Sequence, residues 1–143
     1  MVDLMEHSPS TRAEVSLLLA RYHILATSQR VEIALILLSK PQHLSADQVL
    51  VKVNRHGPVV SKATVYNTLK LFAETGLIRQ VIVDASKVFY DPNTAPHHHF
   101  YHIDSATLTD FDAGELSIAS MPELPEGTEA EGVDVIIRVR NKI

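Results

Sequence analysis

The sequence predicts an α+β protein, with an N-terminal winged helix-turn-helix in residues 1–90 and a small C-terminal αβ dimerisation domain in residues 97–143. Three observations predict this arrangement. Apolar residues recur at helical spacing as far as Gly76, and the spacing then changes to the alternation that is typical of strands. A polar hinge with two prolines, residues 91–96, separates the two parts. The first ten residues are expected to be disordered.

Three short helices are expected in the N-terminal part of the chain. The first spans residues 11–20. Thr27 is an N-cap residue for the second helix, which ends before Pro41. Ser45 and Gln48 have the Ser-x-x-Gln form of a capping box, which predicts the start of the third helix.

The fourth expected helix runs from its N-cap Ser61 to a stop at Gly76. Val65, Leu69 and Phe72 recur at i, i+4 and i+7, so one face of this helix should be buried. The opposite face is small, hydrogen-bonding and basic, and it carries Ala63, Tyr66, Asn67 and Lys70. Such a face suits a helix lying in the major groove of DNA, and an ordinary solvated helix face is the alternative.

Strands are expected after the fourth helix. Residues 77–83 and 88–90 read as a β-hairpin, the wing, with Lys87 near its tip to contact the DNA backbone. Beyond the hinge, the strand pattern returns in residues 97–103, 107–111 and 133–139. A C-terminal part of about 50 residues is too small to form a stable hydrophobic core by itself. We therefore expect it to complete its core in a homodimer.

The composition excludes several classes of protein and site. The chain has 143 residues and no cysteine, so disulfides, a structural zinc site built from four cysteines, a thiolate nucleophile and thiolate-ligated haem are excluded. No apolar run approaches the roughly 20 residues of a membrane span. The N-terminus also lacks the basic start of a signal peptide. The sequence thus predicts a cytoplasmic protein with no membrane partner.

The charge is divided unevenly along the chain. Residues 1–90 hold ten Lys and Arg against seven Asp and Glu, giving +3, whereas residues 91–143 hold three against ten, giving −7. A basic N-terminal part joined to an acidic C-terminal part indicates that one half meets a polyanion and the other does not.

A histidine cluster begins directly after the hinge, with His97, His98, His99 and His102 inside six positions. On a strand, His97 and His99 project to one face and His98 to the other. Neutral imidazole is the commonest ligand of transition metals and a common ligand of haem. A mobile polar loop or a tag is the alternative, but the flanking aromatic and apolar residues predict a folded strand. Weaker candidate ligands are His43, Asp104 and Asp110.

Several motifs together resemble the ferric uptake regulator (Fur) superfamily, from about Tyr22 to Ile143. They are Thr27-x-x-Arg30, His43-Leu-Ser-Ala46, Ala63-Thr-Val-Tyr66 with Leu69 and Phe72, the hairpin, and the histidine-rich hinge. The resemblance implies a homodimer with a metal site near the hinge that couples the two domains. By position, the ligands of that site match His43, His97, His99 and Asp110. The glutamate expected near the end of the wing is replaced by Tyr90.

A narrower resemblance points to the iron response regulator (Irr) branch of this superfamily. It is carried by His97-His-His-Phe-Tyr101 and by the closing Leu124-Pro-Glu-Gly127 and Val133-Asp-Val-Ile-Ile-Arg-Val-Arg140. The branch implies haem sensing through the histidines and control of iron and haem metabolism genes. The alternative is a conventional Fur-type repressor that senses Fe²⁺, Mn²⁺ or Zn²⁺ directly. The family's cysteine pairs are absent, and His102 and Ser105 occupy the first pair.

The sequence therefore predicts a haem- or iron-responsive transcriptional regulator that binds an inverted-repeat operator in double-stranded DNA. A histidine-metal hydrolase is disfavoured because the cluster contains no Glu or Asp, and a purely structural dimerisation module is disfavoured by the face of the fourth helix. The expected DNA contacts are Arg30, Ser61, Lys62, Ala63, Thr64, Tyr66, Asn67, Lys70 and Lys87. The expected metal or haem ligands are His43, His97, His98, His99, His102 and Asp110.

Overall fold

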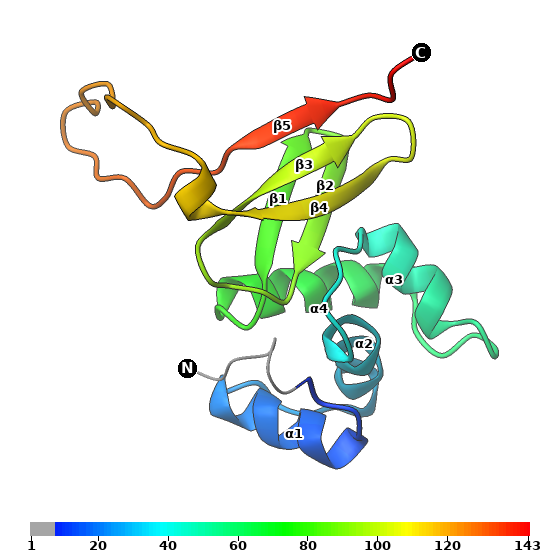
Figure 1. Cartoon of the computed structure of the whole chain (residues 1–143). Coiled ribbons are helices and arrows are strands. Elements are labelled where there is room, and N and C mark those ends of the chain that lie inside the picture. Colours follow the sequence, from blue (N-terminus) through cyan, green and yellow to red (C-terminus); the bar gives the residue numbers. More distant parts are fainter. Residues whose placement is uncertain (1–7) are drawn as a thin grey trace. The chain divides into compact units, whose positions relative to one another are not determined.

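The computed structural model describes residues 8–143 and has an α+β fold, with four helices followed by β-strands (Figure 1). Most of the segment predicted to be disordered, residues 1–7, lies outside the described residues. The chain divides into two compact units, Met1–Thr94 and Ala95–Ile143. Among the described residues, no helix combines the length and the apolar character that crossing a membrane requires.

The first unit contains four helices and a hairpin. The helices are α1 (Arg12–Arg21), α2 (Ser28–Leu38), α3 (Ala46–Val53) and α4 (Lys62–Glu74), and the hairpin pairs β1 (Arg79–Asp84) with β2 (Lys87–Asp91) in antiparallel fashion. The predicted N-caps of α2, α3 and α4 are confirmed, because each side-chain oxygen accepts a hydrogen bond from the third helical amide. The predicted capping box of α3 is also present.

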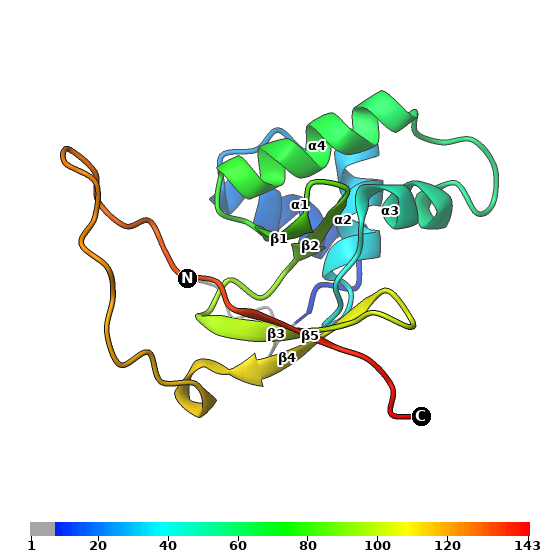
Figure 2. The same cartoon turned by 90° about the horizontal axis from the view of Figure 1, so that it is seen from above.

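The predicted buried face of α4 is confirmed. Val65, Leu69 and Phe72 are fully buried in one hydrophobic core with residues of the other three helices. Gly76 has a φ of 85°, the left-handed conformation that ends a helix with least strain when the residue is glycine. Figure 2 shows α4 along one side of this unit, with α2 and α3 beside it.

A side chain that sequence reasoning missed fixes the connection between α3 and α4. The Asn54 side chain donates from Nδ2 to the Val60 carbonyl at 2.8 Å. Its Oδ1 accepts from the Val59 and Val60 amides at 2.8 and 2.9 Å. These three hydrogen bonds close the turn directly before the N-cap of α4, so Asn54 sets where that helix begins.

The second unit is a three-stranded sheet in the order β4-β3-β5. Its elements are β3 (His97–His102), β4 (Thr107–Asp112), η1 (Ala113–Glu115) and β5 (Ile136–Val139); β3 pairs antiparallel with β4 and parallel with β5. The last strand is shorter than the predicted 133–139, and η1 is a single 3-10 turn directly after β4. Residues 116–135 form no helix or strand and loop away from the sheet (Figure 2).

Candidate functional site

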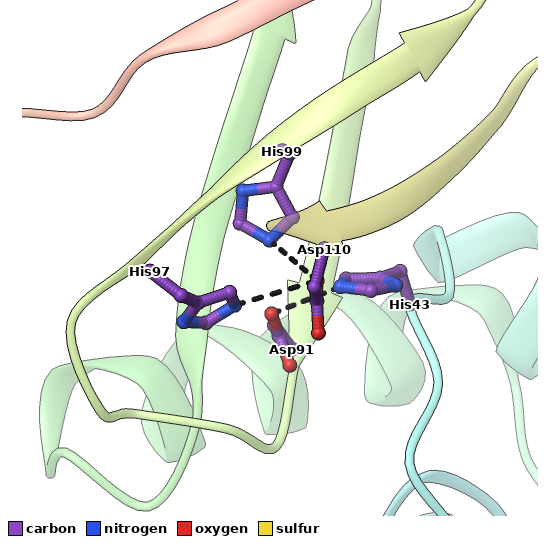
Figure 3. A group of neighbouring side chains, drawn as sticks. All are labelled: His43, Asp91, His97, His99 and Asp110. Atoms are coloured by element: carbon purple, nitrogen blue, oxygen red, sulfur yellow. Dashed lines mark ion pairs between the residues drawn. The ribbon is translucent and has the colours of Figure 1, made fainter. Parts of the chain in front are cut away.

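The central strand of the second unit brings two of the predicted histidines together with one carboxylate. In β3, His97, His99 and Tyr101 are buried, whereas the alternate residues are partly exposed, as the alternation of a strand requires. Asp110 of β4 is the direct cross-strand partner of His99. The carboxylate Oδ1 of Asp110 therefore lies 3.3 Å from His99 Nε2 and 3.6 Å from His97 Nε2 (Figure 3).

A backbone hydrogen bond orients the His97 ring. Its Nδ1 lies 2.6 Å from the Ala95 carbonyl oxygen, which can only accept, so Nδ1 carries the proton and donates it. In the neutral ring, the lone pair is then on Nε2, the atom that faces Asp110. Protein metal sites commonly orient histidine ligands through such a hydrogen bond from the second ring nitrogen.

The three donors fit a small divalent metal ion. Two ligand atoms that are each about 2.1 Å from one ion lie about 3.0–3.4 Å apart. The two nitrogen–oxygen distances of 3.3 and 3.6 Å are close to that spacing, and all three ligand atoms lie within 4.8 Å of one another. Two imidazoles and a carboxylate suit zinc and the neighbouring transition metals.

The first unit holds a second pair of side chains of the types that can bind a metal ion. His43 Nε2 lies 3.0 Å from Asp91 Oδ2, and the Asp91 side chain is 2% exposed (Figure 3). Two backbone hydrogen bonds hold the pair in place: the Leu44 amide donates to the Tyr90 carbonyl at 3.2 Å, and the Tyr90 amide donates to the Leu44 carbonyl at 2.7 Å. The residues next to this bridge are His43 and Asp91.

Asp91 is a candidate ligand that sequence reasoning missed. Tyr90 replaces the glutamate that the family resemblance implies near the end of the wing, and the adjacent Asp91 supplies a carboxylate there. The Tyr90 side chain instead packs into the hydrophobic core. The sequence feature that could have identified Asp91 is its position, as a carboxylate at the boundary between the wing and the hinge.

The other two histidines of the cluster are not part of the group formed by His97, His99 and Asp110. His98 lies at an alternate position of β3, and its Nδ1 accepts a hydrogen bond from the Val135 amide at 3.2 Å. The proton of the neutral His98 ring is therefore on Nε2. His102 is also at an alternate position, and its Nε2 lies 2.9 Å from Thr109 Oγ1. The alternation predicted for this strand, with His98 on the face opposite to His97 and His99, is therefore observed, and His102 lies on the same face as His98.

The predicted DNA-contact residues of α4 lie on its accessible side. Thr64 is partly exposed, and the exposed residues are Ser61, Lys62, Ala63, Tyr66, Asn67 and Lys70. The Tyr66 hydroxyl donates to Asp47 Oδ1 at 2.9 Å. Lys70 Nζ lies 4.0 Å from Glu74, an exposed pair that contributes little to stability.

Two further predicted DNA contacts belong to other elements of the first unit. Arg30 lies in the first turn of α2, where its Nη1 donates to the Leu25 carbonyl at 3.0 Å. Lys87 begins β2, and its Nζ lies 2.9 Å from Asp84 Oδ2. The Lys87 ammonium lowers the pKa of the Asp84 carboxyl to about 2, with help from Ser86.

Comparisons with known proteins place these features in a known group. The sequence profile of the Ferric uptake regulator family matches residues 23–136. The peroxide-responsive repressor PerR of Staphylococcus aureus is 30% identical over 91 residues, which cover 64% of this chain and 62% of the relative. The match thus spans less than two thirds of that repressor's length.

Solved structures show the same fold. The ferric uptake regulator of Francisella tularensis with iron matches with a TM-score of 0.65 and 26% identity, covering 81% of this chain and 90% of that one. The ferric uptake regulator of Pseudomonas aeruginosa with manganese matches with a TM-score of 0.65 and 24% identity, covering 87% and 96%. The second likeness is one of fold alone.

Proposed function

Because the chain belongs to the ferric uptake regulator family, we propose that it is a transcriptional regulator, not an enzyme, whose DNA binding responds to a divalent metal ion. The observation that carries the proposal is the group of His97, His99 and Asp110 on neighbouring strands, with spacing suited to one ion. This favours direct sensing of Fe²⁺, Mn²⁺ or Zn²⁺ over haem sensing.

We propose that His97, His99 and Asp110 are the principal ligands, with His43 and Asp91 as further ligands from the first unit. Three donors from the second unit leave at least one position open on a small cation, which takes four or more ligands. The bound ion would stabilise one arrangement of DNA-reading and dimerising parts, because the hinge lies between the two sets of ligands in the chain. A ligand shifts such an equilibrium only by its difference in affinity for the two states.

We propose that the protein binds an inverted-repeat operator as a homodimer, with one α4 helix in each major groove. The support for DNA contact is the exposed polar and basic side of α4 and the net positive charge of residues 1–90. The support for a dimer is the number of large apolar side chains that the second unit leaves exposed: Ile103, Ile118, Met121, Leu124, Val133 and Ile137.

Haem is the second candidate ligand, favoured by the histidine cluster and the resemblance to the Irr branch. The hydrogen bond from the Val135 amide to His98 weighs against His98 as an axial ligand, because a metal at Nε2 would need that nitrogen to lose its proton. Haem would therefore depend on another of the predicted histidine ligands: His43, His97, His99 or His102. If this candidate is correct, adding haem to the protein should give a Soret band in the difference spectrum against free haem, whereas a divalent metal gives none.

The test measures DNA binding by fluorescence anisotropy in Mn²⁺, Fe²⁺, Zn²⁺ or haem, using duplexes selected by the wild-type protein from a random pool. Replacing His97 and His99 together by Ala should abolish the metal response while the protein stays folded. The matched control is His102→Ala, which removes an imidazole from the same strand but from its other face. His43→Ala should weaken the response to metal more than any response to haem.

Two outcomes would refute this assignment. A normal metal response in the His97→Ala and His99→Ala double variant would exclude these residues as the sensing ligands. An equal loss in His102→Ala would show that the metal response is not specific to His97 and His99.

A further inference from the structure

An acidic side chain lies against the exposed, DNA-reading side of α4. Asp47, in the first turn of α3, accepts the hydrogen bond of the Tyr66 hydroxyl at 2.9 Å. Lys62, one turn before Tyr66, places its Nζ 5.7 Å from the centre of the tyrosine ring, within the range of a cation–π contact. Tyr66 is 41% exposed. Asp47 thus holds the hydroxyl of Tyr66, and Lys62 lies over its ring, while the side chain remains accessible.

The direction of the hydrogen bond decides what Tyr66 can offer to a base. An ionised carboxylate only accepts hydrogen bonds, so the tyrosine hydroxyl must be the donor. The pKa of Tyr66 is correspondingly raised, chiefly by this hydrogen bond. With its proton directed at Asp47, the hydroxyl has only lone pairs left for any other partner.

Both partners are fixed by the ends of their helices. The Ser45 and Gln48 capping box begins the turn that carries Asp47. Ser61 caps α4 through the Thr64 amide, and Asn54 closes the turn between the two helices. Local hydrogen bonds therefore order the backbone on both sides of the contact between Asp47 and the Tyr66 hydroxyl, before any DNA binds.

We propose that Asp47 is a specificity-determining residue: it takes the Tyr66 proton, so that the pair presents hydrogen-bond acceptors to the major groove. Such an edge recognises the amino donors of the groove, adenine N6 or cytosine N4. It disfavours the acceptor edges of guanine and thymine. The inference rests on the proposed function, in which α4 enters the major groove.

Asp47 has two simpler roles that must be separated from this one. A carboxylate in the first turn of a helix stabilises that helix, and a negative charge near DNA weakens binding to every sequence alike. Either role predicts a uniform change in affinity. A role in specificity instead predicts a change in base preference at one position of each half-site.

The experiment selects duplexes from a random double-stranded DNA pool with the full-length protein in Mn²⁺ and sequences the bound fraction. The wild-type protein should select a motif in which one position of each half-site is restricted to adenine or cytosine on the contacted strand. Asp47→Ala and Tyr66→Phe should reduce the discrimination at that position by roughly five- to hundredfold. Asp47→Asn should largely restore it, because the amide oxygen can still accept the hydroxyl proton.

A measurement without DNA checks the contact itself. The chain has four tyrosines, and the ultraviolet titration of wild type minus that of Tyr66→Phe isolates Tyr66. In Asp47→Ala, Tyr66 should ionise at lower pH than in the wild-type protein. Unchanged ionisation would show that the contact is absent in solution and would overturn the inference.

The selection can contradict either the role proposed for Asp47 or the proposed function as a whole. If the wild-type protein selects a motif and Asp47→Ala selects it with the same preference at every position, the inference is wrong and the proposed function stands. If both Asp47 variants bind all sequences more tightly by the same factor, Asp47 acts through its charge alone. If the wild-type protein selects no motif, the proposed function fails and the inference fails with it.

Discussion

Removal of the Asn54 side chain tests whether the turn between α3 and α4 determines the position of α4, the helix that we propose contacts DNA. In Asn54→Ala, three hydrogen bonds are lost, one to the Val60 carbonyl and two from the Val59 and Val60 amides. Val60 is 5% exposed, so water cannot easily replace the two bonds to its backbone. Val59 is half exposed, and its amide can turn to water at little cost.

The expected decrease in the free energy of unfolding follows from the three lost hydrogen bonds. A buried backbone group that loses its partner costs about 1–3 kcal/mol, and a typical net hydrogen bond contributes about 1 kcal/mol. Two buried bonds and one exposed bond give a decrease of about 2–4 kcal/mol in the free energy of unfolding. DNA affinity should also fall, because the N-terminal turn of α4 is no longer held. Mn²⁺ binding at His97 and His99, in the other unit, should change little.

The assay is urea unfolding followed by circular dichroism, with the midpoint and slope fitted separately. The matched control is Asn67→Ala, which removes the same side chain from an exposed position of α4. It should leave the free energy of unfolding within about 0.5 kcal/mol of the wild-type value, because Ala favours a helix slightly more than Asn. A loss below about 0.5 kcal/mol in Asn54→Ala would refute the role assigned to this side chain.

Three further predictions concern the core, the wing and the proposed metal ligands. Phe72→Ala should lower the free energy of unfolding by about 3–5 kcal/mol, measured in urea, because this ring is fully buried. In Lys87→Met, the pKa of Asp84 should rise from about 2 toward its ordinary value, measured by NMR titration. Because folding lowers this pKa, the pair's stabilisation should be present above about pH 4 and lost as the pH falls toward 2. An unchanged pKa would exclude Lys87 as the cause. Asp110→Asn should weaken Mn²⁺ binding at least about tenfold in calorimetry, whereas His102→Ala should not.

The sequence by itself determined the elements of this protein and most of their ends. Thr27, Ser45 and Ser61 cap the helices as predicted, and Gly76 ends α4 with a positive φ. The alternation of the histidines also followed from sequence, because side chains on a strand point to opposite faces in turn. These features depend on residues within a few positions of one another. Over such short distances, backbone geometry and the spacing of apolar residues allow few alternative conformations.

Tertiary structure alone decided which distant side chains meet. The backbone bridge that places Asp91 beside His43 joins segments far apart in the chain, and no period of the sequence marks it. The contact between Asp47 and Tyr66 likewise depends on how α3 packs against α4. Asp110 meets His99 through the register of two strands, in which a shift of one residue would turn the carboxylate to the other face. Packing and register fix such contacts because they are set by the shape of the whole core and not by any local stretch.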